Sequence, residues 1–485
     1  MMKVTKTAES QESQNINLPY VVAIAVIAAL GGLLFGYDWV VISGAKPFFV
    51  PYFHLTDANQ IGWAMSCALL GALVGALITG WLTDKFGRKK LLAIAAFLFG
   101  VSSVCTGWAP SFILFALWRI TGGVAIGMAS NLSPLYIAEI SPARLRGRLV
   151  AVNQLTIVVG ILLADMVNWL IARPLAAHAT AAMIANSWDG RIGWRWMFSA
   201  VAIPAAVFLV GALLIPESPR WLAKQARSQE ARNILARIAG DVQADQELIA
   251  IQETLRGEQA GRVKLPDLLA PGVLKIVGIG VLLAIFQQWC GINVIFSYAQ
   301  DIFNAAGYHV SGVLFDIVIT GAVNLVFTIV AMGLVDRLGR RPLMLFGAGG
   351  LVVTHTLLGF AYHDHIKGLP VVILVMAAIA CYALTLAPIT WVLISEIFPN
   401  RIRGTAISIA VSSLWIADFV LTQTFPALKA AVGTSGAFWL YAMICAAGFI
   451  FVFLAVPETK GVSLEELEKN VLRQHRQIQD AANAK

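Results

Sequence analysis

The stretch 80–89, GWLTDKFGRK, recurs in the second part of the chain at 333–341 as GLVDRLGRR. Two further stretches recur in the same order: EISPARLRG at 139–147 with EIFPNRIRG at 396–404, and PESPR at 216–220 with PETKG at 457–461. The two copies of these landmarks are separated by 241 to 257 residues. Three landmarks repeated in one order predict a duplicated chain of two homologous halves.

The composition places this repeat in a membrane. Of 485 residues, 58% are hydrophobic and only 13% are charged, and the mean hydropathy is +0.76. A spanning helix needs roughly 20 predominantly apolar residues. Twelve runs meet this need, at 18–45, 60–83, 90–109, 111–138, 147–173, 193–215, 272–303, 311–335, 341–362, 369–396, 403–425 and 435–456. We therefore predict an all-α membrane protein with twelve transmembrane helices in two pseudo-symmetric six-helix halves.

The landmarks and the apolar runs divide the chain into five parts. Residues 18–215 form the N-terminal six-helix half, and residues 271–456 form the C-terminal six-helix half. The polar stretch 216–270 contains segments rich in Ala, Arg, Glu and Gln, which predict a small cytoplasmic helical layer. Residues 1–17 form a cytoplasmic N-terminus without the pattern of a cleaved signal. Residues 457–485 form a cytoplasmic C-terminal helix and tail.

Most basic residues fall on one side of the predicted membrane. Of the 35 Lys and Arg residues, 28 lie in the termini and the even-numbered loops, and Arg119 lies within an apolar run. The other six lie on the opposite side: Lys46, Arg173, Arg191, Arg195, Lys367 and Lys429. Because Lys and Arg mark cytoplasmic loops, both termini are predicted to be cytoplasmic. The net charge of +8 then reflects topology and not nucleic-acid binding.

The repeated landmarks combine acids with bases at the predicted cytoplasmic ends of the helices. We predict that they form ion pairs, within each half and across the halves, that hold one conformation and release it in another. The predicted gate or latch residues are Asp84, Arg88, Glu139, Arg146, Glu217, Arg220, Asp336, Arg340, Glu396 and Arg403. The alternative is that these charges serve topology alone, but that would explain the bases and not the matched acids.

Three motifs point to one family. PESPR at 216–220, PETKG at 457–461 and QQWCGIN at 287–293 are more specific than the GWLTDKFGRK pattern. Together they resemble the sugar porter family of the major facilitator superfamily, over essentially the whole chain from Gly31 to Gly461. The chain is similar in character to bacterial sugar–proton symporters, such as those for D-xylose. The resemblance implies the major facilitator fold, with substrate bound between two halves that rock around it.

Asp38 is an ionisable residue inside the first apolar run, and Arg119 is one inside the fourth. Such residues are costly in a membrane and need a partner. At about 1.5 Å per helical residue, both lie roughly 12–15 Å below the outer surface, so a contact is feasible. A helix movement that separates them would switch the proton affinity of the acid. The resemblance implies proton coupling at these positions; a static structural ion pair is the alternative.

Neutral amides and aromatic rings occur within the predicted membrane runs. They suit a neutral sugar, which offers hydroxyls and apolar C–H faces, and the resemblance implies that they contact one. An ideal helix would place Asn293 about 140° from Gln288, so both face one cavity only if Gly291 allows a distortion. Buried amides that only join helices are the alternative. The candidates are Gln154, Gln287, Gln288, Asn293, Asn324, Trp391 and Trp415, with Phe35 and Tyr298 near the pocket and its outer gate.

Several positions depart from the family pattern. Asp418 stands where Asn is frequent, and it joins the substrate-binding candidates because it follows Trp415 by three residues. Ile161 occupies a position where the family frequently has Gln, and Ala387 occupies one where it usually has Gly. Residues 297–300 read SYAQ where YYAP is common. The sugar therefore stays open among xylose, glucose, arabinose, galactose and a polyol.

The sequence thus predicts a secondary active transporter that imports a monosaccharide, a pentose or hexose with xylose or glucose favoured, together with a proton by alternating access. A proton-independent uniporter of the same fold is the main alternative, and a non-transporting sugar sensor is another. We find no phosphate loop, metal cluster, nucleophile elbow or paired carboxylates, so we expect no enzyme activity, no metal and no cofactor, with the proton as coupling ion. The expected location is the bacterial inner membrane. We expect the protein to work as a monomer whose partners are the sugar, the proton and the lipid bilayer, and we expect no nucleic-acid partner.

Overall fold

The computed structural model describes residues 16–142, 144–175, 180–260, 271–307, 310–398 and 402–460. Throughout these residues the chain forms helices and short connections, and no strand occurs among them. Residues 1–15, 261–270 and 461–485, which belong to the predicted N-terminus, linker and C-terminal tail, lie outside the described residues, so the predicted C-terminal helix stays a prediction.

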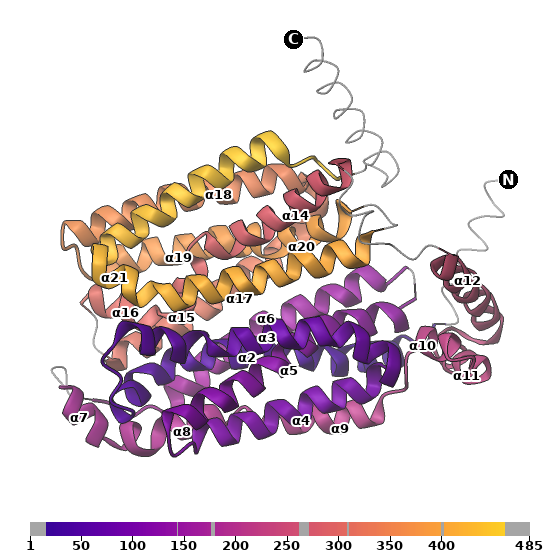
Figure 1. Cartoon of the computed structure of the whole chain (residues 1–485), viewed down its shortest axis with the longest axis horizontal. Helices are drawn as coiled ribbons and strands as arrows, with labels where there is room; N and C mark the ends of the chain where they lie inside the picture. Colours follow the sequence, from indigo (N-terminus) through magenta and orange to yellow (C-terminus); the bar gives the residue numbers. More distant parts are fainter. Residues whose placement is uncertain are drawn as a thin grey trace, which may run out of the picture.

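Six spanning segments form the N-terminal half, drawn in indigo to magenta in Figure 1. The sixth span, Asp189–Leu214, is composite and follows the short helix α7 (Ala181–Asn186). It joins the π-helix η1 (Asp189–Gly193) to α8 (Trp194–Ser199) and α9 (Ala202–Leu214). The first five spans are single helices: α2 (Leu18–Tyr52), α3 (Ala58–Phe86), α4 (Arg88–Gly107), α5 (Phe112–Ile140) and α6 (Arg146–Ile171).

The C-terminal half contains six more spans, and two of them are interrupted. The elements are α14 (Pro271–Trp289), α15 (Ile292–Ser297), α16 (Ala299–Ala305), α17 (Val310–Leu338), α18 (Arg340–His363), α19 (Leu369–Leu384), α20 (Leu386–Glu396) and α21 (Arg403–Ala455). α14 with α15, and α19 with α20, each form one broken span. α21 contains two spans, because Gly433 has a non-helical backbone with φ 71°. The described chain has eleven long apolar helices when α21 is counted once. When α21 is divided at Gly433, the number of spans is twelve, as predicted.

The two halves lie side by side, as Figure 1 shows. α3 packs against α21 and α6 packs against α17, so the halves meet along these helices. Within a half, small residues let helices approach closely. A Cβ built on Gly36 of α2 would lie only 1.9 Å from the Ile157 carbonyl oxygen of α6. This close packing fixes α2 against α6, the two helices that carry much of the site.

A layer of short helices lies at one end of the two bundles (Figure 1). It consists of α10 (Pro219–Lys224), α11 (Ser228–Ala239) and α12 (Asp241–Ala260). Trp221, Leu222 and Ala231 form its small apolar core. The Asn17 amide donates to the Ile238 carbonyl oxygen and ties the start of α2 to this layer. These are the helices that the sequence predicts between the halves.

Large apolar side chains are exposed on the long helices. Ile113, Leu214 and Leu454, for example, are 72%, 77% and 76% exposed. Soluble proteins rarely leave extended apolar surfaces uncovered, whereas the hydrocarbon of a bilayer covers them over the length of such helices. The chain is a multi-pass, all-α membrane protein.

Candidate functional site

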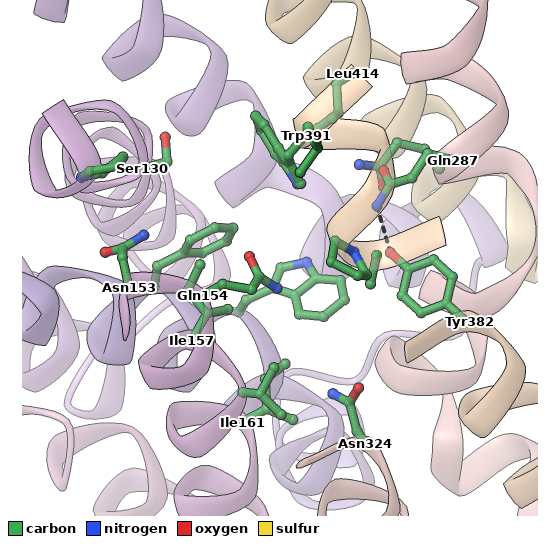
Figure 2. Close-up of a pocket in the computed structure, with 18 of the residues that line it drawn as sticks. Ser130, Asn153, Gln154, Ile157, Ile161, Gln287, Asn324, Tyr382, Trp391 and Leu414 are labelled. Carbon is green, nitrogen blue, oxygen red and sulfur yellow. Dashed lines mark hydrogen bonds between the residues drawn. The ribbon is translucent and has the colours of Figure 1, made fainter. Parts of the chain in front are cut away.

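A cavity of about 510 Å³ lies between the two halves. Side chains reach it from α2, α5 and α6 of the N-terminal half and from six helices of the C-terminal half. Figure 2 shows Gln154 reaching into it from one side, with Asn153 on the same side, opposite Gln287 and Tyr382. Nine of the ten predicted substrate-binding residues line it: Phe35, Gln154, Gln287, Gln288, Asn293, Asn324, Trp391, Trp415 and Asp418.

The seventh span is broken where its three amide side chains converge on the cavity. Between α14 and α15, Gly291 has a left-handed backbone with φ 88° and ψ −10°. Glycine adopts this conformation freely, whereas a side chain would strain it. The carbonyl oxygen of Cys290, beside the break, accepts a hydrogen bond of 2.8 Å from His355 Nε2, which satisfies it inside the membrane. The distortion that the sequence predicts at this glycine is present, and all three amides face the cavity.

These amides are held by hydrogen bonds to other cavity residues. Gln287 Nε2 donates to the Tyr382 hydroxyl at 2.6 Å (Figure 2). Asn293 Nδ2 donates to Gln288 Oε1 and, at 3.0 Å, to Asp418 Oδ1. Gln287 Oε1 is buried without a hydrogen-bond partner among the described residues. Because a buried acceptor is costly unless it is satisfied, this oxygen suits a ligand hydroxyl.

Aromatic rings complete the wall. The rings of Phe35 and Trp415 lie 5.8 Å apart, and they belong to different halves. Trp415 Nε1 is buried without a partner in the described chain, so it is a free donor. Amides, one carboxylate and aromatic faces together can bind a small polyhydroxylated molecule, with its hydroxyls on the polar groups and its C–H faces on the rings.

Several lining residues were not predicted from the sequence. Trp39 could have been found, because it follows Phe35 by four residues and shares its helix face. Tyr382 has no motif around it, and only the packing of α19 against α15 brings it to the amides. The departures Ile161 and Ala387 also line the cavity. Other missed polar residues of the lining are Ser130, Asn153 and Ser395.

Tyr298, the tenth predicted residue, does not line the cavity but lies at its closed end. It stands between α15 and α16, and its hydroxyl donates to the Thr422 carbonyl oxygen at 2.7 Å. Its ring centroid is 4.7 Å from that of Phe425. These contacts pack the broken seventh span against α21 at the end of the molecule away from the landmarks.

A charged cluster joins the two halves at the same end. Asp301 of α16 forms ion pairs with Lys46 of α2 and, at 3.2 Å, with Lys429 of α21. At the other end, the cavity lining extends to Gly147 and Ser395, beside the repeated landmarks. The cavity is therefore closed by the cluster and opens toward the landmark end.

Asp38 and Arg119 form a buried ion pair inside the N-terminal half and outside the cavity lining. Arg119 Nη1 lies 3.0 Å from both carboxylate oxygens of Asp38, and both side chains are at most 3% exposed. The guanidinium also lies 5.5 Å from the ring centroid of Phe198. The contact that the sequence makes feasible is present. α2 thus carries the ion-pair residue Asp38 within one helical turn of the cavity residues Phe35 and Trp39.

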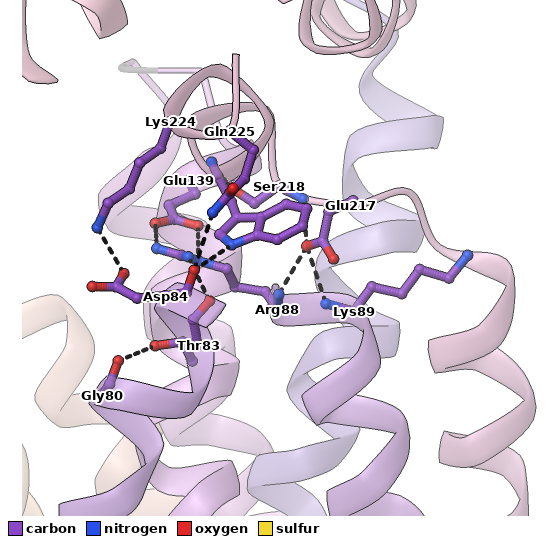
Figure 3. Close-up of polar contacts among 11 residues, drawn as sticks. Gly80, Thr83, Asp84, Arg88, Lys89, Glu139, Glu217, Ser218, Lys224 and Gln225 are labelled. Carbon is purple, nitrogen blue, oxygen red and sulfur yellow. Dashed lines mark hydrogen bonds and ion pairs between the residues drawn. The ribbon is translucent and has the colours of Figure 1, made fainter. Parts of the chain in front are cut away.

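The landmarks of the N-terminal half form one polar cluster (Figure 3). Arg88 donates through Nε and Nη2 to both carboxylate oxygens of Glu139, each at 2.8 Å. Glu217 Oε1 accepts from the Arg88 backbone N–H at 2.9 Å. Asp84 pairs with Lys224 of α10 at 2.9 Å. The cluster connects α4, α5 and the linker layer.

The landmarks of the C-terminal half repeat these contacts. Arg340 Nη2 lies 3.2 Å from Glu396 Oε1, and Glu458 accepts from the backbone N–H groups of Arg340 and Arg341, each at 3.0 Å. Burial would raise the pKa of Glu458, but the N–H groups of Lys460, Arg340 and Arg341 outweigh it and lower this pKa below its ordinary value. The sequence repeat is thus also a repeat of contacts.

The remaining landmark residues are placed as follows. Arg146 and Arg403 begin α6 and α21, and Arg220 lies on α10. Asp336 lies on α17, and its side chain is outside the described structure. The two arginine–glutamate pairs above each join helices of one half, so ion pairs of the landmark residues across the halves stay a prediction.

Residues 24–471 match the family described as sugar (and other) transporters. The chain belongs to this family. A D-xylose–proton symporter of Escherichia coli strain K12 is 38% identical over 483 residues, with 93% of this chain and 96% of the relative covered. A glucose transport protein of Synechocystis is 40% identical over 475 residues, with 95% and 99% covered. Members of this family are transporters and not enzymes.

Solved structures give the same fold. A partially occluded, inward-open conformation of the xylose transporter from E. coli matches with a TM-score of 0.81 and 34% identity, covering 92% of this chain and 100% of that one. The same transporter bound to 6-bromo-6-deoxy-D-glucose matches with a TM-score of 0.78 and 37% identity, covering 93% and 99%. The fold is therefore that of the major facilitator superfamily.

Proposed function

We propose that this protein imports a monosaccharide together with a proton by alternating access. The observation that carries the proposal is the arrangement on α2, which lines the amide- and aromatic-walled cavity with Phe35 and Trp39 and holds the Asp38–Arg119 ion pair within the same helical turn. Relatives named as D-xylose, arabinose and galactose symporters use protons, which supports the same coupling here. A movement of α2 would act on both sites together.

The proposed substrate class is a neutral pentose or hexose, with xylose or glucose favoured. The cavity volume of about 510 Å³ leaves ample room for one sugar ring. Among the described lining residues, Asp418 is the one carboxylate and no basic side chain occurs, which disfavours an anionic substrate. Trp415 Nε1 and Gln287 Oε1 supply a free donor and a free acceptor that sugar hydroxyls can satisfy.

In the proposed cycle, a proton from outside binds Asp38 and weakens its attraction to Arg119. α2 can then tilt with its cavity face, and the sugar is carried from the outer to the inner opening. Loss of the proton re-forms the ion pair, the state found here with the cavity open at the landmark end. The free energy of a buried ion pair depends strongly on whether both partners stay charged, which makes the pair a suitable switch.

The setting follows from the charge distribution. We propose that the landmark end and both termini face the cytoplasm, as the positive-inside rule predicts, in the inner membrane of a bacterium. The two landmark clusters then act as an inner gate, and Tyr298 with the Lys46–Asp301–Lys429 cluster acts as an outer gate. One chain holds both halves, so a monomer suffices.

Uptake into proteoliposomes tests the proposal. Radiolabelled xylose, glucose, arabinose and galactose are offered with an imposed inward pH gradient, with and without an uncoupler. We expect at least one sugar to accumulate and the uncoupler to abolish this accumulation. Equilibration that the uncoupler does not change would instead indicate a uniporter, and binding without transport would indicate a sensor.

A further inference from the structure

Asp165 is a buried acid that the transport cycle above does not use. It lies on α6 and is only 1% exposed. Neither of its carboxylate oxygens has a hydrogen-bond partner among the described residues. This differs from Asp38, which has an arginine within 3.0 Å. A buried carboxylate that is ionised and unpaired is far more costly than a protonated one.

Asp165 lies directly beyond the closed end of the cavity. Ile157 and Ile161 of α6 line the cavity, and Asp165 is the next residue on that helix face, one turn farther from the landmarks. On α17, Asn324 lines the cavity and Gly321 lies about one turn farther in the same direction. A Cβ built on Gly321 would be 2.9 Å from Asp165 Oδ2. The carboxyl group therefore rests against the opposite half, in the layer that seals the cavity from outside.

The surroundings of Asp165 provide little to balance a charge. The Tyr37 hydroxyl is buried without a partner in the described structure, and it interacts electrostatically with both Asp165 and Asp38. Arg119 is occupied by Asp38, and Arg195 donates to the Gly107 carbonyl oxygen at 2.8 Å. The charged and titratable side chains in the outer halves of the helices packed against α6 are Tyr37, Asp38, Lys46 and Tyr52 of α2, Arg119 of α5, Arg195 of α8 and Asp316 of α17.

We propose that Asp165 is a second proton-binding site, filled from the external side, and that a proton must occupy it before α6 can close against α17. When the outer ends of these helices separate, water reaches the carboxyl group and it can ionise. Closure expels this water, so the proton binds from outside before the seal forms and returns outside when the seal opens. This proton is not carried across, and its role is to make closure depend on external acidity. The inference rests on the proposed function for the existence of an outward-open state.

Infrared difference spectroscopy of the full chain in proteoliposomes tests the protonation directly. We expect wild type near neutral pH to show a carboxylic-acid C=O band that Asp165→Asn lacks. Asp57→Asn is the matched control, because Asp57 is an exposed outer-side cap of α3 and Asn caps a helix equally well. It should keep the band. A spectrum of Asp165→Asn identical to wild type would mean that Asp165 is ionised, which overturns the proposal.

Sugar exchange at equal pH on both sides tests the role in closure. The wild-type exchange rate should fall as pH rises, approaching about tenfold per pH unit where loss of this proton limits closure. Asp165→Asn and Asp165→Leu, which cannot ionise, should both have flatter profiles, and Asp57→Asn should follow wild type. Profiles that coincide for wild type and both variants overturn the proposal. Absence of exchange in wild type at every pH would count against the proposed function instead, and the infrared comparison would still decide the protonation of Asp165.

Discussion

The first and fourth spans of each half make a polar contact, but the two contacts differ in chemistry. In the N-terminal half, Asp38 of α2 and Arg119 of α5 form a buried ion pair. In the C-terminal half, the corresponding spans meet through the neutral hydrogen bond from Gln287 of α14 to Tyr382 of α19. An ion pair of this kind changes when a proton binds, whereas an amide–phenol bond does not change near neutral pH. Under the proposed function, the N-terminal contact would respond to protons, and the C-terminal contact would orient an amide of the sugar site.

The backbones of the two pairs also differ. α2 and α5 are continuous helices, whereas both C-terminal spans are broken, at Gly291 and at Thr385. Broken membrane helices are tolerated where they border a cavity, and they turn polar groups toward it. The ion pair, on unbroken helices, lies outside the cavity lining. The duplicated architecture therefore carries a charged contact on unbroken helices and a neutral contact on broken ones.

Neutralising Asp38 should have the largest effect on transport of the changes that separate the two contacts. Asp38→Asn keeps the size of the side chain but removes the group that takes up a proton, so uphill accumulation in proteoliposomes with an imposed pH gradient should be lost completely. Sugar exchange without a gradient should persist, because the cavity lining is unchanged. Accumulation by Asp38→Asn equal to that of wild type would show that the ion pair is a static structural element.

Removing the base should mainly reduce stability. Arg119→Gln leaves Asp38 buried without its cation, which costs about 3–5 kcal/mol of unfolding free energy when one partner of a buried pair is lost. The double variant Asp38→Asn, Arg119→Gln should recover much of this loss, because two neutral amides replace the pair. Thermal unfolding in one detergent compares the three proteins. A double variant as unstable as Arg119→Gln would mean that the charge on Asp38 is not the cause.

Much of the architecture could be predicted because its signals are local in the sequence. The apolar runs and the repeated landmarks give twelve spans in two halves, and the register of the seventh-span amides requires a distortion at Gly291. Contacts between distant spans carry no such signal. Tyr382 reaches Gln287 only through helix packing, and Tyr298 bonds the Thr422 carbonyl oxygen at the end away from the landmarks instead of lining the cavity. Asp165 was visible as an acid in an apolar run, but its lack of a partner is a property of the packed structure.

Truncating one amide of the seventh span should weaken sugar binding more than folding. Gln288→Ala removes a side chain that faces the cavity and accepts from Asn293, so the affinity should fall by about 1–3 kcal/mol, or roughly 5- to 150-fold. Calorimetry with the transported sugar measures this change. Gln225→Ala, at the exposed residue that follows α10, is the control and should bind as wild type. Unchanged affinity in Gln288→Ala would remove this residue from the site.

The smallest expected effect tests the neutral contact itself. Tyr382→Phe removes the hydroxyl that accepts from Gln287 Nε2, so the amide loses its orientation and sugar affinity should fall by about 1 kcal/mol, or roughly fivefold. Tyr441→Phe is the matched control, because the Tyr441 hydroxyl is buried without a hydrogen-bond partner in the described chain. Uphill accumulation at saturating sugar should survive in Tyr382→Phe, unlike in Asp38→Asn. If Tyr382→Phe instead lost proton-driven accumulation with its affinity intact, the two halves would not divide proton and sugar as their chemistry indicates.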